Sequence, residues 1–372
     1  NEWESSNENQ KHYEELSDGK HIIKVKVKDK VGNESEIYSQ EVELYHEYEA
    51  SIFLANGSIE GGTTLTNLLT NGSFESSGNS WTTNATYTNV NNSIGGEIVN
   101  ENIYHGSKAV YIDDSSTTEG YWSYQALSPA PAINDMVYGA GYLKADGTHT
   151  SDILFTYRTE ENEKIDFGQA RSSNVNYTKI STLVTSPAAN LAFQFGSSTG
   201  NLSQSYFDGL YVINITKDFQ NNLPTQEWLD ERIEYFDKTA SILTRTVNTK
   251  DEMSVPVILL TGYVVEDVKC SNADAKIEND MLTINNIKGD VQCKIKSKDT
   301  TVPNSNFTIG SNTAGSNNWY KDLSVKISVS DTGSGVASAK YCTTTGSTCT
   351  PGTNATISNN SFTVTLNSNA RA

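Results

Sequence analysis

The chain has 372 residues and a formal net charge of −18, from 45 acidic and 27 basic residues. This charge repels phosphate backbones and argues against a nucleic-acid partner, and it leaves divalent cations and neutral polymers as the expected ligands. Seven prolines, 26 glycines and 19 tyrosines predict short strands joined by many turns. No apolar run reaches the roughly 18 residues that a membrane span needs, so no membrane insertion is expected. The length predicts several domains.

The first 50 residues predict a piece of a β-sandwich. In "HIIKVKVKDKVGNES" apolar residues alternate with lysines up to Lys28, and the strand is followed by a turn. The turn has the pattern D-x-x-G-N, at Asp29, Gly32 and Asn33. It resembles the final hairpin of bacterial immunoglobulin-like surface repeats. The resemblance implies that residues 1–50 are the closing half of such a domain.

An ordered set of motifs occupies the centre of the chain. An N-G-x-F-E opening at residues 71–75 is followed by a G-x-x-A strand at 106–109 and a strand rich in tyrosine at 121–125. A proline-containing pair of strands at 185–191 and a final D-G-L strand at 208–210 come after them. This order resembles the jelly-roll carbohydrate-binding modules of families four, nine and twenty-two. The resemblance implies a jelly-roll domain within residues 51–245.

The same resemblance implies a structural calcium ion between the first and last strands of the jelly roll. Ca²⁺ takes six to eight oxygen ligands from carboxylates, carbonyls and water. The implied carboxylate ligands are Glu75 and Asp208, with Asn71, Ser73 and Lys108 as further donors, the last through its backbone carbonyl. The alternative is that Glu75 is an exposed strand residue and Asp208 a turn residue.

The resemblance also implies a polysaccharide or cell-surface glycan as the partner. Sugar rings stack on aromatic planes, and amides bind their hydroxyl groups. The candidate contacts are Trp122, Tyr124, Tyr142, Tyr157, Gln125 and Gln194. Aromatic residues at strand spacing are also common in cores, and Trp81 is expected to be structural.

One helix is predicted, over residues 224–236. Pro224 suits a first helical turn, Thr225 suits the N-cap, and Leu229, Ile233 and Phe236 form one apolar stripe. With the residues before it, this segment resembles one found in phage tail-fibre and bacterial surface proteins. We expect the helix to dock on the jelly roll.

Residues 246–298 predict a small β unit that contains a disulfide. Turns are expected at Asn279-Asp280 and at Lys288-Gly289. The four cysteines of the chain fall into two local pairs, Cys270 with Cys293 and Cys342 with Cys349, without the histidines or further cysteines of a zinc site. Two disulfides are therefore predicted, and they indicate an oxidising compartment.

Residues 299–372 resemble the opening half of the same immunoglobulin-like repeat. They begin with a D-T-x-x-P linker and contain a turn from Asp331 to Gly335. Two explanations of the partial domains stay open. The chain is a piece of a tandem array, or the partial domains of neighbouring copies complete each other by strand addition.

No catalytic residues are predicted, because the chain has no Gly-rich phosphate loop, no His-Glu-x-x-His motif and no Gly-x-Ser-x-Gly motif. The expected fold is all-β and multidomain, with a central jelly roll. The expected function is non-catalytic glycan binding and adhesion by an extracellular protein, secreted or on a bacterial cell surface. The alternatives are a structural stalk or filament subunit, and an accessory region of a larger secreted glycosidase.

Overall fold

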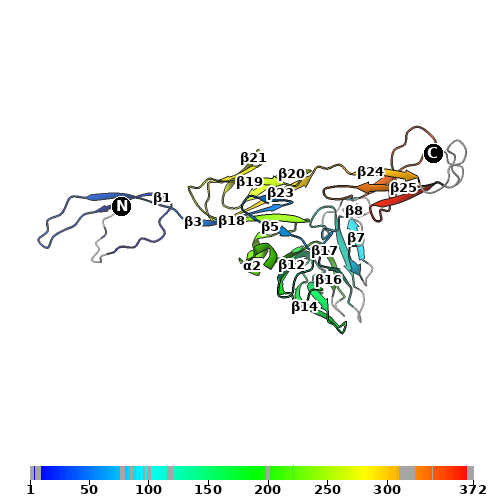
Figure 1. Cartoon of the computed structure of the whole chain (residues 1–372). Helices are drawn as coiled ribbons and strands as arrows, with labels where there is room; N and C mark the ends of the chain where they lie inside the picture. Colours follow the sequence, from blue (N-terminus) through cyan, green and yellow to red (C-terminus); the bar gives the residue numbers. More distant parts are fainter. Residues whose placement is uncertain are drawn as a thin grey trace.

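The computed structural model describes residues 4, 10–75, 80–83, 87–91, 93–94, 97–98, 102–114, 120–197, 202–220, 222–309, 323–336 and 338–366. The described residues form strands and two short helices, which confirms the predicted all-β, multidomain class. In Figure 1 the N-terminal hairpin extends to one side of a central sandwich, the jelly roll lies below the sandwich, and the C-terminal strands lie at the other side.

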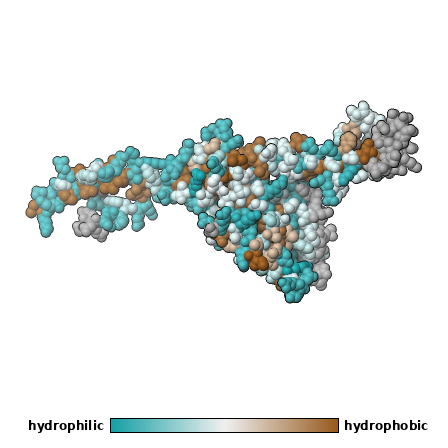
Figure 2. Space-filling model, in the orientation of Figure 1, coloured by the Kyte–Doolittle hydropathy of each residue, from teal (hydrophilic) through white to brown (hydrophobic). Residues whose placement is uncertain are grey.

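The predicted N-terminal hairpin is confirmed. Strands β1 (Gly19–Val25) and β2 (Tyr38–Leu44) are antiparallel. In the turn, the Asp29 carboxylate accepts hydrogen bonds from the backbone N–H groups of Val31 at 3.0 Å and Asn33 at 2.8 Å. The pairing places Val25 opposite Tyr38, so both side chains lie on one face of the hairpin. This apolar face is exposed, and hydrophobic residues run along the hairpin in Figure 2.

The jelly roll consists of two five-stranded sheets. The first, called here the covered sheet, has the order β15 (Thr178–Thr185), β12 (Met136–Lys144), β17 (Gln204–Asn214), β10 (Lys108–Asp113) and β7 (Tyr87–Asn91). The second, called the open sheet, has the order β14 (Lys164–Ser172), β13 (Ser151–Arg158), β16 (Ala192–Ser197), β11 (Trp122–Ala126) and β6 (Thr82–Thr83). A short pair, β8 (Ser93–Ile94) and β9 (Glu97–Ile98), lies between β7 and β10 in sequence.

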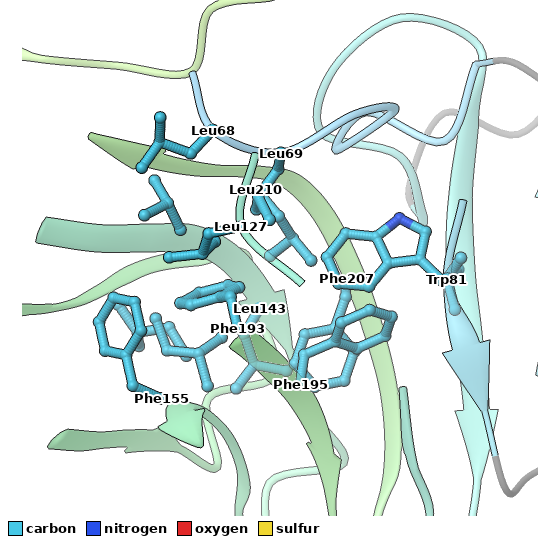
Figure 3. Packing of buried hydrophobic residues seen from close by; sticks show 14 of the residues in the cluster. Leu68, Leu69, Trp81, Leu127, Leu143, Phe155, Phe193, Phe195, Phe207 and Leu210 are labelled. Atoms are coloured by element: carbon cyan, nitrogen blue, oxygen red, sulfur yellow. The ribbon is translucent and has the colours of Figure 1, made fainter. Parts of the chain in front are cut away.

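An aromatic core fills the space between these two sheets (Figure 3). Phe155, Phe193 and Phe195 point inward from the open sheet, and Phe207 points inward from the covered sheet. The Trp81 indole packs edge-on against Phe195, with the ring centroids 5.0 Å apart. Trp81 is therefore a structural residue, as the sequence predicts.

A second β-sandwich is built from residues on both sides of the jelly roll. One sheet has the order β20 (Tyr263–Cys270), β23 (Val291–Asp299), β3 (Glu47–Ala55), β18 (Thr239–Asn248) and β5 (Thr63–Thr66). The other has the order β21 (Asp274–Glu278), β22 (Met281–Asn285), β19 (Met253–Leu259) and β4 (Gly57–Ile59). The jelly roll is therefore inserted between β5 and β18.

This strand pairing divides the chain differently from the predicted boundaries at 50/51 and 245/246. Strand β3 crosses the first predicted boundary and pairs with β18 along its whole length, from Glu47 opposite Asn248 to Ala55 opposite Ala240. It also pairs in parallel with β23. The apolar run of β3 is buried in the sandwich core, together with Val255 and Ile284.

A third core joins the jelly roll to the sandwich. Two helices follow β17, α1 (Ile215–Phe219) and α2 (Gln226–Arg232). The Thr225 side chain caps α2 by accepting a hydrogen bond from the backbone of Trp228, as predicted. The helix is shorter than the predicted span of 224–236, because the backbone is extended at Ile233. This change of direction allows Ile233 and Phe236 to be buried between the covered sheet and the sandwich.

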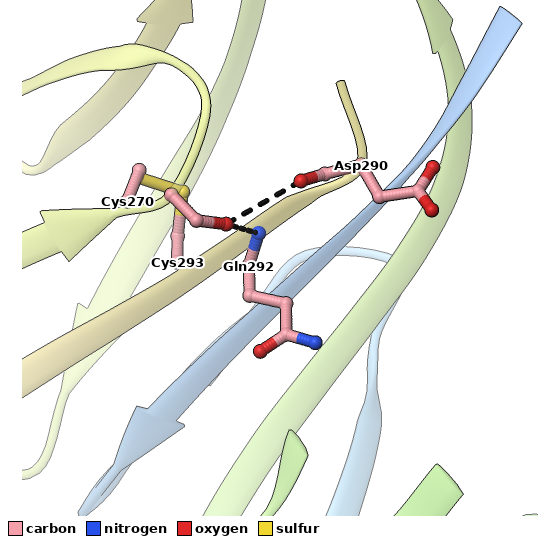
Figure 4. Close-up of a disulfide and its surroundings, with 5 residues drawn as sticks. Cys270, Asp290, Gln292 and Cys293 are labelled. Carbon is pink, nitrogen blue, oxygen red and sulfur yellow. Dashed lines mark hydrogen bonds between the residues drawn. A yellow bond between two sulfur atoms is a disulfide. The ribbon is translucent and has the colours of Figure 1, made fainter. Parts of the chain in front are cut away.

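Both predicted disulfides are confirmed. Cys270 and Cys293 lie directly opposite each other on β20 and β23. Beside them, the Ser271 hydroxyl accepts a hydrogen bond from the backbone of Gln292 at 2.9 Å (Figure 4). Cys342 and Cys349 form the second disulfide. Among the described residues, no helix is long and apolar enough to cross a bilayer.

The C-terminal strands form a separate three-stranded sheet, with the order β24 (Asn304–Ile309), β25 (Leu323–Ser330) and β28 (Ser361–Leu366). A two-stranded pair, β26 (Ala339–Tyr341) and β27 (Thr353–Ala355), accompanies it. The linker residue Asp299 accepts hydrogen bonds from the backbone and hydroxyl of Ser334, at 2.6 and 2.8 Å. The predicted linker and the predicted Asp331–Gly335 turn are therefore in direct contact.

Candidate functional site

The outward face of the open sheet is hollowed into a cleft with a volume of about 470 Å³. Side chains alternate along each strand, so Phe155 and Phe193 enter the core while their neighbours face outward. The outward residues that line the cleft include Trp122 on β11, Gln194 on β16 and Asp152 on β13. The cleft thus combines one indole with amide and charged groups.

A glycine leaves the cleft floor open beside the indole. The strand pairing places Gly196 opposite Trp122 on one side and opposite Asp152 on the other. A Cβ atom at this position would lie only 2.1 Å from the backbone oxygen of Tyr121. Position 196 therefore requires glycine, and the space between Trp122 and Asp152 holds no intervening side chain.

A lysine from the edge strand reaches across the cleft. The Lys164 ammonium donates a hydrogen bond to the Gln194 side-chain oxygen at 2.8 Å and lies 2.9 Å from the Asp166 carboxylate. It also lies 5.5 Å from the centroid of the Trp122 ring. The side chain is therefore held by an ion pair, an amide and an aromatic face, and its position is defined before any ligand binds.

A second charged group lies on the floor of the cleft. The side chain of Asp152 is 4% exposed, and it accepts a hydrogen bond from the Gln169 amide. The Arg171 guanidinium lies 3.8 Å from the same carboxylate and donates to the Gln169 side-chain oxygen. Lys164, which lines the cleft, and Arg171, which lies beside Asp152 outside the lining, thus each have a carboxylate beside them.

The structure separates the six predicted glycan contacts. Trp122, Tyr124 and Gln194 share the outward face of the open sheet, and the rings of Trp122 and Tyr124 are 5.4 Å apart. Tyr142 belongs to the covered sheet, where it is 4% exposed. Its ring stacks on the ring of Tyr104, with the ring centroids 3.6 Å apart.

The other two predicted contacts lie outside the cleft. Tyr157 faces the jelly-roll core and packs against Phe167. Gln125 binds the backbone of Thr70 and the carbonyl of Ser80, so it fastens the opening segment of the jelly roll.

Among the cleft residues that were not predicted from the sequence, four carry charged or amide side chains, namely Asp152, Lys164, Asp166 and Gln169. Their only sequence signal is alternation, because in "KIDFGQAR" the polar Lys164 and Asp166 alternate with the apolar Ile165 and Phe167. The same pattern is typical of any half-exposed strand.

A second candidate site brings Glu75 and Asp208 to one loop, residues 104–108. The Glu75 carboxylate accepts hydrogen bonds from the backbone N–H groups of Ser107 at 2.6 Å and Lys108 at 2.8 Å. The Asp208 carboxylate accepts from the backbone N–H groups of Tyr104 at 2.9 Å and His105 at 2.7 Å. The first and last predicted elements of the jelly roll are thus connected through this loop.

The electrostatics of this second site are dominated by burial. Asp208 is fully buried, and its burial raises the pKa of its carboxyl group to about 8. Hydrogen bonds from His105 and Tyr104 lower this pKa, and the charge of Glu75 raises it further. The burial of Asp208 therefore favours a proton on its carboxyl group or a cation beside it.

The other predicted calcium donors lie around the same loop. The backbone oxygen of Asn71 accepts hydrogen bonds from the Trp81 indole at 3.3 Å and from the backbone of Phe74 at 3.2 Å. Ser73 is buried, and the Lys108 ammonium donates to the backbone oxygen of Glu75 at 2.9 Å. In the described part of the chain, no three His, Cys, Asp or Glu side chains converge as a metal-binding group.

Comparisons with known proteins bear on the fold. No family model matches the sequence, and no curated protein matches it. Solved structures that are similar to part of the chain include the following three. A family 16 carbohydrate-binding module has 17% identity and a TM-score of 0.31, and the match covers 39% of this chain and 99% of the module.

The second is the CBM22-1 xylan-binding domain of Paenibacillus barcinonensis Xyn10C, with 15% identity, a TM-score of 0.30, and coverage of 43% of this chain and 97% of that domain. The third is the enzymatically active domain of Bacteriophage CBA120 tailspike protein 4, with 12% identity, a TM-score of 0.30, and coverage of 40% of this chain and 21% of that chain. The structural neighbours thus include jelly-roll carbohydrate-binding modules, one of them from family 22, which the sequence also resembles.

Proposed function

We propose that this protein binds glycans without chemical turnover, through the cleft on the open sheet. The observation that carries the proposal is the half-buried Trp122 indole beside an open floor at Gly196, with Lys164 and Gln194 within reach. A pyranose ring stacks on an aromatic plane, and its hydroxyl groups bind charged and amide side chains. The cleft offers both kinds of contact in one place.

Glycan-array screening followed by calorimetry tests this proposal. We expect binding to one class of polysaccharide, and we expect Trp122→Ala to weaken it at least about tenfold through loss of the stacking surface. Tyr38→Ala is the matched control, because Tyr38 is an aromatic residue that is 67% exposed on the N-terminal hairpin. Unchanged binding in Trp122→Ala would exclude this cleft as the site.

We also propose that Ca²⁺ binds between Glu75 and Asp208 and stabilises the jelly roll. The two carboxylates supply hard oxygen ligands, and the burial that raises the pKa of the Asp208 carboxyl group would be offset by a bound cation. When bound, the ion would hold the opening segment and β17 to the 104–108 loop. Each carboxylate accepts hydrogen bonds from backbone N–H groups, and further lone pairs on its oxygens are suited to binding a cation.

Thermal unfolding with calcium and with a chelator tests this second proposal. We expect a higher melting temperature with calcium, and a loss of that difference in Glu75→Gln. Glu278→Gln, at an exposed position on β21, is the control. Equal melting temperatures under both conditions would contradict the proposed calcium site.

The two disulfides support an extracellular location, either secreted or on a cell surface, because such bonds persist in oxidising compartments. In that setting the cleft would serve adhesion to glycan-bearing surfaces, or would bring a glycosidase to its substrate. Adhesion of protein-coated beads to immobilised polysaccharide, and its loss in Trp122→Ala, tests the first of these roles.

A second candidate function is a stalk or filament subunit, and one observation favours it. The hairpin exposes Val25 by 47% and Tyr38 by 67% on one face, and β24 exposes Phe307 by 77% and Ile309 by 41%. Joining these two apolar faces between copies would give open, head-to-tail chains. Sedimentation at rising protein concentration tests it, and a monomer throughout would exclude this function.

A further inference from the structure

We infer, on the basis of the proposed glycan binding, that the cleft selects uncharged glycans over acidic ones, and that Asp166 and Asp152 impose this selection. The partner class is a polysaccharide whose hydroxyl groups, rather than carboxylates or sulfates, enter the cleft. Asp166 is the specificity-determining residue that can be tested most directly, since it is exposed on the edge strand β14.

The first step is that Lys164, the cation that lines the cleft, and Arg171, which lies beside Asp152 outside the lining, are both already engaged by carboxylates. Lys164 lies 2.9 Å from Asp166, and Arg171 lies 3.8 Å from Asp152. Recognition of a sugar carboxylate uses a cation whose charge is available to the ligand. Here a uronate would have to compete with an aspartate that is held on the protein at high local concentration.

The second step is that the aspartates stay in the cleft when a ligand arrives. The Asp152 side chain is only 4% exposed and is bound by the Gln169 amide, so it cannot swing away into solvent. A ligand carboxylate beside it would meet a like charge where screening by water is weak. The overall charge of −18 adds a repulsive field of the same sign.

The third step is that hydroxyl groups satisfy the cleft without breaking these ion pairs. A sugar hydroxyl both donates and accepts, so it can accept from the Lys164 ammonium and donate to Asp166 or to the Gln194 oxygen. All three groups are joined to one another through Lys164. A neutral ring on Trp122 can therefore add hydrogen bonds to a network that remains charge-balanced.

The experiment compares matched probes by calorimetry. The probes are β-1,4-linked gluco- and manno-hexaoses and the same chains oxidised to uronates at C6, which differ only in charge and in that one group. For the natural protein we expect the neutral hexaose that binds to have at least about tenfold higher affinity than its uronate partner. Asp166→Asn removes the carboxylate beside Lys164. In this variant we expect the affinity for the uronate to rise about threefold to tenfold, and the ratio of neutral to uronate affinity to decrease accordingly.

The control is Asp280→Asn, which makes the same chemical change on the distant β21–β22 turn and lowers the overall negative charge equally. Its neutral-to-uronate ratio is expected to match that of the natural protein. Melting curves establish that each variant is folded.

The outcomes separate the two proposals. If the natural protein binds uronate and neutral hexaoses equally, or if Asp166→Asn leaves the ratio unchanged, the charge selection is wrong while glycan binding stands. If the array and all hexaoses show no binding, the proposed function is wrong, and the selection falls with it.

Discussion

The two sheets of the jelly roll both carry aromatic residues on their outward faces, yet only one of these faces is open. On the covered sheet, Tyr138, Tyr142 and Tyr211 point away from the jelly-roll core and are buried in the junction with the sandwich. On the open sheet, Trp122 and Tyr124 point outward and remain half-buried at the cleft. Strands of similar character are therefore buried in a core on one side, and on the other side they form the cleft that we propose for glycan binding.

The difference comes from elements that lie far away in the sequence. Helix α2 and the segment after it supply Leu229, Ile233 and Phe236 to the covered face, and the sandwich supplies Phe53 and Ile242. Because these residues are fixed by their own packing, the covered face is a permanent core. The open face is hollowed instead, and charged groups line the hollow. Four substitutions test whether this division of roles is real.

The largest effect is expected on the covered face. Tyr142→Ala removes a ring that is 4% exposed and stacked on Tyr104, and it should lower the free energy of unfolding by about 3–5 kcal/mol. Denaturant titration measures this loss. Tyr142→Phe keeps the ring and should lose less than about 1 kcal/mol. If Tyr142→Ala is fully stable but loses glycan binding, this face takes part in recognition and the comparison fails.

The second-largest effect is a pH dependence of the free energy of unfolding that arises on the covered face. Lys179 on β15 donates to the carbonyl oxygens of Asp230 at 2.8 Å and Ile233 at 2.6 Å, at the end of α2. Burial lowers its pKa from 10.5 to about 8, with Asp230 acting in the opposite direction. Between these two values the unfolded chain binds more protons, so the free energy of unfolding should rise with pH.

The size of this rise is about 2 kcal/mol between pH 8 and pH 10, by linkage. Urea titrations at the two pH values measure it in the natural protein and in Lys179→Met, which lacks the titrating group. The difference between the two proteins isolates Lys179 from the tyrosines that titrate nearby. Identical pH slopes would show that Lys179 is not held in a buried place at this junction.

A smaller effect is expected at a residue of the open sheet that points away from the cleft. Gln125 accepts a hydrogen bond from the backbone of Thr70 at 2.6 Å and donates to Ser80 at 2.8 Å. Gln125→Ala should cost about 1–2 kcal/mol of unfolding free energy, because these backbone groups lose their partner. Glycan affinity in calorimetry should stay unchanged. A large loss of affinity with unchanged stability would place Gln125 among the ligand contacts.

Local sequence patterns predict the parts of the fold that depend on near neighbours. The Asp29 turn and the two disulfides each involve residues close in sequence, and all are confirmed. The pairing of β3 with β18 joins segments almost 200 positions apart across an inserted domain. Strand periodicity carries no information about such a partner, so the predicted domain boundaries differ from the strand pairing.

Local sequence patterns also fail to predict which residues meet in the candidate site. Trp122 and Tyr142 both occupy alternating positions on aromatic strands, and the sequence around each gives no sign of which face another element covers. Asp152 and Lys164 belong to no motif, and charges on a half-exposed strand are typical of solvated faces. Lys164 reaches the Trp122 ring across two intervening strands of the open sheet, and this arrangement follows from a strand order that the local sequence does not reveal.

The smallest effect concerns whether Trp122 acts alone on the open face. Tyr124 lies beside it with the ring centroids 5.4 Å apart, and Gln194 lies opposite Tyr124 in the strand pairing. Tyr124→Ala should weaken glycan binding only about threefold, since the ring supports the indole without replacing it, and should change stability by less than about 0.5 kcal/mol. Calorimetry and denaturant titration on the same sample measure both values. A loss as large as that of Trp122→Ala would mean that the two rings form one extended platform, and the open face would then accept more than one sugar ring.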